Sequence, residues 1–206
     1  APADTDELLI SDAGVLKRID ASLIGGSGYK KLITTNVTSS TATVSLDGSF
    51  SSDYDVYRVY WYNVIPVTNN QILYFRFNQS GSAVSSSSYK FLLQGGYNAS
   101  SGSITEDRAT HSSSADGQVQ TSKFGVGEEN SGGGSNGYID IFNPLSTDHH
   151  KWSTGHSCDP LNDESYVAHY KVTTRFESTS ALSGITYYFG SGNIESGTFC
   201  LYGLNK

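Results

Sequence analysis

The chain has 206 residues and a formal net charge of −7 at pH 7, with 36% hydrophobic and 16% charged residues. That length suffices for one well-packed domain with an appendage. The scattered acidic charge argues against nucleic acid as a partner, because phosphate binding needs a basic surface. No apolar run is long enough to span a bilayer, so we expect no membrane insertion.

The first 28 residues differ in pattern from the rest of the chain. Two short apolar runs flank the turn signal Asp12-Ala13-Gly14, which predicts a small β-hairpin, and a glycine-rich linker follows it. So short a segment cannot bury its own apolar side chains, so another surface has to cover them. We therefore interpret residues 1–28 as an attachment arm and linker. Its expected attachment or oligomer interface comprises Leu8, Leu9, Ile10, Val15 and Leu16.

Residues 29–206 show a succession of short segments with a period of two and no sustained helical period. The segment 54–65 is typical, since residues of one parity include Tyr57, Val59 and Trp61 while the other parity includes Arg58 and Tyr60. Similar segments occupy 29–35, 41–47, 71–78, 89–96, 117–125, 137–144, 166–176, 184–192 and 197–204. The pattern predicts an all-β domain, an antiparallel β-sandwich or jelly roll of about ten strands.

Two further features complete the predicted fold. The polar stretches 97–117 and 125–137 bury little apolar surface, so we expect surface loops or strand extensions there. The segment 184–204 is expected to be a hairpin whose last strand is locked into the sandwich or shared with another subunit, because an uncovered apolar strand would aggregate.

Four spaced segments, "SSDYDVYRVYWYNVIPVTNNQILYFRF", "SYKF", "GYIDIFNP" and "GITYYFGSGNIESGTFCLYGLNK", occur in this order. Over residues 45–206 this arrangement resembles a β-rich domain of tailed-bacteriophage tail-fibre and other virion-surface proteins. The last strand of that family commonly combines Ser-Gly-Thr with Leu-Tyr-Gly, here Ser196-Gly197-Thr198 and Leu201-Tyr202-Gly203. The resemblance implies a component of the virion surface, often a homotrimer, whose partners are other capsid or tail proteins. It brings no catalytic residue with it.

The stretch "STDHHKWSTGHSCDP", residues 146–160, concentrates reactive side chains. A zinc site would use His149 or His150 with His156 and Cys158, and with Asp148 or Asp159 as the fourth ligand. These spacings match no paired-ligand pattern, and one loop rarely supplies every ligand. We therefore interpret the stretch as an exposed loop with Trp152 at a strand edge, and we expect no metal and no cofactor. Cys158 and Cys200 are interpreted as free thiols.

Aromatic and polar side chains in predicted loops favour sugar binding. Sugar rings present apolar faces that stack on aromatic rings, while amides, carboxylates and imidazoles bind hydroxyl groups. The candidate ligand-binding residues are Tyr97, His149, His150 and Trp152.

The adjacent acids Glu106-Asp107, Glu128-Glu129 and Asp163-Glu164 do not indicate a glycosidase pair, because neighbours on a strand face opposite ways. The leading hypothesis is a non-enzymatic phage adhesin on the particle surface that binds a host-surface glycan. Two alternatives stay open, a capsid decoration or cement protein without a receptor and a carbohydrate-active depolymerase.

Overall fold

The computed structural model describes residues 7–20, 28–98, 104–111, 117–128, 132–161 and 166–206. Within these ranges the regular structure is entirely β, with no α-helix. The strands are β1 (Glu7–Asp12), β2 (Val15–Asp20), β3 (Tyr29–Val37), β4 (Val44–Asp47), β5 (Tyr54–Pro66), β6 (Leu73–Gln79), β7 (Ser82–Ala83), β8 (Tyr89–Asn98), β9 (Ile104–His111), β10 (Val119–Gln120), β11 (Ser135–Phe142), β12 (Lys151–Pro160), β13 (Val167–Phe176), β14 (Gly184–Phe189) and β15 (Ile194–Asn205).

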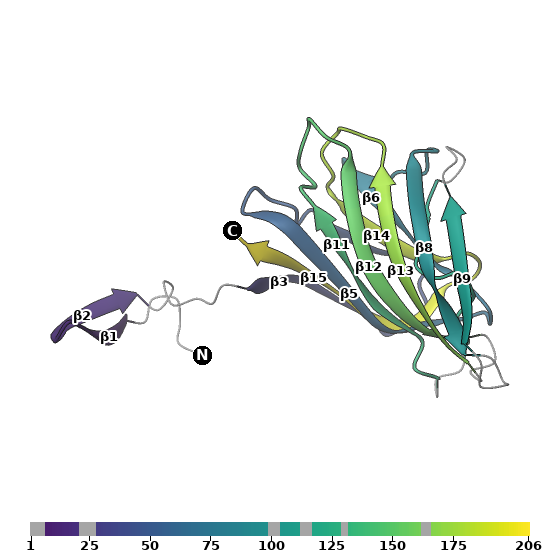
Figure 1. Ribbon diagram of the computed structural model, residues 1–206, viewed down its shortest axis with the longest axis horizontal. Coiled ribbons are helices and arrows are strands. Elements are labelled where there is room, and N and C mark those ends of the chain that lie inside the picture. The colour runs from purple at the N-terminus through teal and green to yellow at the C-terminus, as the bar shows by residue number, and fades with distance from the viewer. Residues whose placement is uncertain (1–6, 21–27, 99–103, 112–116, 129–131, 162–165) are drawn as a thin grey trace.

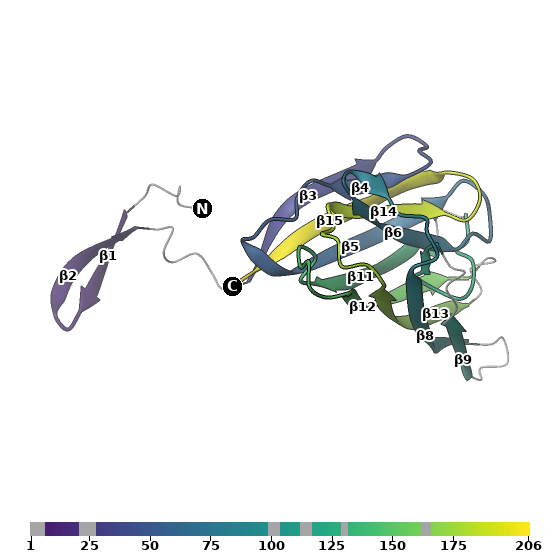
Figure 2. The ribbon, with the colours of Figure 1, turned by 90° about the horizontal axis from the view of Figure 1, so that it is seen from above.

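Two antiparallel sheets pack face to face (Figures 1 and 2). The large sheet has eight strands in the order β3-β15-β5-β11-β12-β13-β8-β9. The small sheet has the order β10-β6-β14-β4, with β7 added to β6. This arrangement confirms the predicted antiparallel β-sandwich, but the structure has more strands than the ten or so that the sequence predicted.

The alternation in β5 explains how the core is formed. Tyr57, Val59 and Trp61 are buried, while Tyr60 and Tyr62 on the opposite face are exposed. Burying each large side chain in this way stabilises the folded state by about 1.5–3 kcal/mol relative to leaving it exposed. Trp61 packs over Gly137 of the neighbouring β11, where a Cβ atom would lie 2.4 Å from the indole ring. The predicted inward and outward faces of this segment are therefore correct.

The prediction for the C-terminal hairpin was wrong in its pairing. β14 pairs with β4 and β6 in the small sheet, whereas β15 pairs with β3 and β5 in the large sheet. The chain crosses between the two layers after β14, and Tyr187 meets Phe199 across the core with ring centroids 5.1 Å apart. The expectation that the last strand is locked into the sandwich is confirmed, since β15 has a partner on each edge.

Strands occur both in a polar stretch predicted to form surface loops or strand extensions and in the histidine-rich stretch interpreted as a loop. The polar stretch 97–117 includes β9, which pairs with β8 at the edge of the large sheet. The stretch 146–160 was interpreted as a loop, but from Lys151 onward it is β12, an interior strand between β11 and β13. Its alternation of polar and small residues concealed a strand whose inward face is itself polar. Both cysteines are free, as expected.

The N-terminal hairpin is confirmed by the pairing of β1 with β2. Ala13 and Gly14 form its turn with φ angles of 51° and 84°, the left-handed region in which glycine is favoured. Val15 and Leu16 are exposed, whereas the side chains of Leu8, Leu9 and Ile10 lie outside the described part of the structure. The described residues contain no helix long and apolar enough to cross a membrane.

Candidate functional site

The candidate site lies at the end of the large sheet where β11, β12 and β13 meet their loops. Strand pairing places Trp152 directly between Phe142 and Arg175 on the outer face of the sheet. Trp152 is 49% exposed and Phe142 is 38% exposed, which is unusual for such large apolar side chains. The Arg175 guanidinium carbon lies 5.9 Å from the centre of the Trp152 ring.

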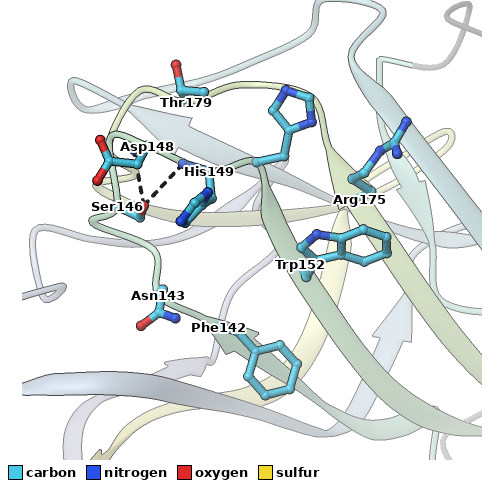
Figure 3. Close-up of a pocket in the computed structure, with 9 residues that line it drawn as sticks. Phe142, Asn143, Ser146, Asp148, His149, Trp152, Arg175 and Thr179 are labelled. Atoms are coloured by element: carbon cyan, nitrogen blue, oxygen red, sulfur yellow. Dashed lines mark hydrogen bonds between the residues drawn. The ribbon is translucent and has the colours of Figure 1, made fainter.

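These side chains line a hollow of about 600 Å³. Figure 3 shows Trp152 and Arg175 together on one side and Ser146, Asp148 and His149 on the other. The residues that line the hollow are Phe142, Asn143, Ser146, Asp148, His149, His150, Trp152, Arg175 and Thr179. The hollow thus combines an aromatic wall with a wall of small polar and ionisable groups.

A turn organised by Ser146 forms the polar wall. The Ser146 hydroxyl accepts hydrogen bonds from the backbone N–H groups of Asp148, at 3.2 Å, and His149, at 3.3 Å. The backbone N–H of Ser146 in turn donates to the Asn143 carbonyl oxygen at 3.0 Å. This bonding fastens the backbone of the turn, while the side chains of Asp148 and His149 are exposed.

A buried lysine fastens this loop to a second one. Lys151 is fully buried, and its ammonium group donates to the backbone carbonyl oxygens of Ser146 (2.5 Å), His149 (2.9 Å), Thr179 (3.3 Å) and Ser178 (3.5 Å). The first two carbonyls belong to the loop before β12, and the other two belong to the loop after β13. Burial lowers the pKa of Lys151, but the carbonyl dipoles favour its charged form. Lys151 is therefore the residue that positions the two loops around the hollow.

An ion-pair cluster holds Arg175 beside the tryptophan. Arg175 forms a salt bridge with Glu177, and Lys90 contacts the same carboxylate at 3.1 Å. Hydrogen bonds from Lys90 and Arg175 lower the pKa of Glu177, which keeps it ionised. The contact with Glu177 thus orients the Arg175 guanidinium, and Trp152 remains accessible to a ligand.

The structure brings together three of the four predicted ligand-binding residues, His149, His150 and Trp152. Tyr97 lies elsewhere, in β8 rather than in a loop, where its ring packs against Phe124 with centroids 5.2 Å apart. Sequence reasoning missed Phe142, Arg175 and Thr179, which come from other strands and loops. Only the alternation of exposed and buried positions in 137–144 and 166–176 hinted that Phe142 and Arg175 face outward.

The chemistry of the hollow suits binding of a polar ring-shaped ligand. Aromatic faces can stack on a sugar ring, while Asn143, Asp148 and His149 offer hydrogen-bonding groups. Asp148 is the sole carboxylate among the described lining residues, whereas glycoside hydrolysis generally needs a pair. Of the predicted acid pairs, Asp163-Glu164 and Glu129 lie outside the described residues. No group of three or more histidine, cysteine or acidic side chains in the described ranges converges as a metal site.

In comparisons with protein-family models, curated proteins and solved structures, nothing matches this chain.

Proposed function

We propose that this protein is a structural and adhesion protein of a tailed-phage virion that binds a host-surface glycan in the hollow beside Trp152. The carrying observation is the half-exposed Trp152, flanked by Phe142 and Arg175 and faced by a rigid polar loop. An exposed indole ring beside a wall of polar groups is available to stack on a sugar ring, and this combination supports a ligand-binding role.

The assignment to a virion rests on the resemblance of the last strand, Ser196-Gly197-Thr198 followed by Leu201-Tyr202-Gly203, to phage surface proteins. In this proposal the N-terminal hairpin attaches the protein to other virion proteins through Val15, Leu16 and neighbouring apolar residues. The sandwiches assemble as a homotrimer, so that several weak glycan contacts act together.

The two tryptophans allow a direct test of glycan binding. Trp61 is buried in the core and Trp152 is exposed, so a glycan bound in the hollow changes the fluorescence of Trp152 alone. We expect host polysaccharide to shift the emission of the wild type and to leave that of Trp152→Phe unchanged. Retention of Trp152→Ala on immobilised polysaccharide should be at least about tenfold weaker. Tyr97→Ala, altered outside the hollow, is the matched control and should bind normally.

Other results would favour the alternatives. Equal retention of Trp152→Ala and the wild type would exclude this hollow as the binding site. Release of oligosaccharides would indicate a depolymerase. Absence of retention for the wild type would leave a decoration or cement protein. The solution mass from light scattering tests the trimer separately, and a stable monomer would contradict it.

A further inference from the structure

Two histidine side chains from neighbouring strands meet on the outer face of the large sheet. His156 belongs to β12 and His169 to β13, and both are accessible to solvent. Nδ1 of His156 lies 3.0 Å from Nε2 of His169, and the two ring planes are nearly parallel, at 22° to each other with centroids 5.2 Å apart. This pair is separate from the hollow beside Trp152, which neither residue lines.

The neighbouring groups keep the pair available for a ligand. Tyr138 of β11 packs against His156, with ring centroids 5.6 Å apart. Lys171 is paired with His156 across the strands, and Cys158 is paired with His169. Burial, His169 and Lys171 lower the pKa of His156, which favours a neutral ring with a free nitrogen lone pair. Beyond His169, the next two positions across the sheet are Gly96 and Glu106, and Glu106 and His169 line one shallow hollow.

We propose that His156 and His169 form a two-imidazole site for a borderline divalent transition-metal ion, such as Zn²⁺ or Ni²⁺. Neutral imidazole is the side chain that these ions prefer. Two nitrogens bound at about 2.0–2.1 Å in tetrahedral geometry are about 3.3 Å apart, close to the spacing already present here. The strands fix both Cα positions, so binding requires rotation of the two side chains, which turns both nitrogen lone pairs toward one ion. The imidazole that donates the shared hydrogen bond takes its other tautomer, with the proton on the ring nitrogen that faces away from the ion.

The remaining coordination positions of such an ion face solvent. Since the described residues supply no third converging ligand, water occupies those positions in the isolated chain. We therefore expect weaker binding than at a four-ligand structural zinc site. An open position also lets the ion accept a carboxylate or imidazole from another molecule. The site thus offers a metal-dependent contact in addition to the proposed glycan contact.

The histidine-rich stretch 146–160 contains one of the two residues of this site. His156 was a candidate zinc ligand there, but with the histidines of the preceding loop. His149 and His150 instead line the hollow at the sheet end, whereas His169 comes from the next strand. Only the register that aligns Cys158 with His169 makes His169 a diagonal neighbour of His156.

The test uses the full chain without a histidine tag, in a Cys158→Ser background so that no exposed thiol binds the metal. Calorimetric titration with Zn²⁺, and then with Ni²⁺, should show one ion per chain. Substituting either residue, as His156→Ala or His169→Ala, should weaken binding at least about tenfold. The matched controls His149→Ala and His150→Ala should bind like the parent.

Two further measurements keep the result independent of folding and of glycan binding. The imidazole NMR signals of His156 and His169, but not those of His149 and His150, should shift when Zn²⁺ is added. His169→Gln keeps a polar side chain of similar size and should have a normal thermal unfolding midpoint while losing the metal. Full zinc binding by His169→Gln, or loss of binding in the loop variants, would overturn the proposal.

Discussion

The two ends of β12 each bury a charged residue, and the protein treats the two in opposite ways. Lys151 at the start of the strand donates to four backbone carbonyl oxygens. Asp159 near the other end is also fully buried, yet neither carboxylate oxygen has a hydrogen-bond partner among the described residues. A buried charge is costly unless it is paired or neutralised. One end solves this problem by solvating a cation with the backbone, whereas at the other end burial raises the pKa of the acid, which therefore loses its charge more readily as the pH falls.

The surroundings of Asp159 explain the second solution. Burial raises its pKa to about 6, and the nearby hydroxyls of Ser135, Ser157 and Ser122 offset only part of that rise. These hydroxyls are largely engaged elsewhere. Ser157 donates to the Thr121 carbonyl at 2.9 Å, and Ser122 donates to the Phe124 carbonyl. The comparison shows that the loops at one end are held by an ion, whereas the other end has a group that changes charge near neutral pH.

The largest effect is expected at the lysine end. Lys151→Met keeps the apolar stem but leaves four carbonyl oxygens without their donor, which should lower the free energy of unfolding by about 3 kcal/mol. Urea denaturation of the wild type and the variant at pH 7 measures this difference. Lys171→Met, on the exposed face of β13, is the matched control and should change stability by less than about 0.5 kcal/mol. If the two variants proved equally stable, the carbonyl cage would not hold the loops.

The second effect belongs to Asp159 and depends on pH. Its folded-state pKa, about 6, lies above the unfolded value of about 3.9. The protonated form therefore favours folding, and that contribution is complete below about pH 4 and lost as the pH rises to 6. Two pKa units correspond to about 3 kcal/mol. Asp159→Asn should remove this loss, becoming more stable than the wild type at pH 7.5 but not at pH 4. Parallel stability curves for the two proteins between pH 4 and 7.5 would contradict the assignment.

The smallest effect is expected for a charge pair outside the core, which sharpens the contrast with the two buried charges. Arg58 donates two hydrogen bonds of 2.6 Å to Asp140, and its guanidinium lies 4.4 Å from the centre of the Tyr138 ring. Both side chains of the pair are partly exposed, so solvent screens their attraction. Asp140→Asn should cost about 1 kcal/mol or less, and high salt should reduce that cost further. Thermal unfolding at low and high salt measures it.

The sequence predicts those parts of this protein in which apolar side chains alternate inward and polar side chains outward. In β5 the inward residues are aromatic or aliphatic, so the buried face was identified correctly. In β12 the inward residues include Lys151, Ser157 and Asp159, and the same rule failed because polar residues occupy the buried face. Lys151 donates to the carbonyl oxygens of Ser178 and Thr179, and Ser157 donates to that of Thr121. These acceptors come from distant segments, which a local pattern does not contain.

The candidate site follows the same division. His149, His150 and Trp152 are close together in sequence and were predicted together. Arg175 and Thr179 reach the hollow only because β13 pairs with β12, and that register depends on the whole sheet. The crossing from β14 to β15 was missed for a related reason. A short polar connection fits a hairpin and a change of sheet equally well. The outcome depends on pairing with strands far away in the sequence, β4 and β6 for β14 but β3 and β5 for β15.

The position of β15 determines how the protein can fold. β3 and β5 are not paired with each other, because β15 lies between them and connects residues as distant as Thr34 and Cys200, which are 166 positions apart. The large sheet therefore cannot assemble in chain order, since β3, its first strand along the chain, has no partner until β15, its last strand, arrives. Closing so long a loop before any pairing energy is gained slows folding, and domains dominated by such contacts fold in milliseconds to seconds or more slowly. Until that strand arrives, the edges of β3 and β5 are exposed, which makes the incomplete sheet the state most prone to aggregation.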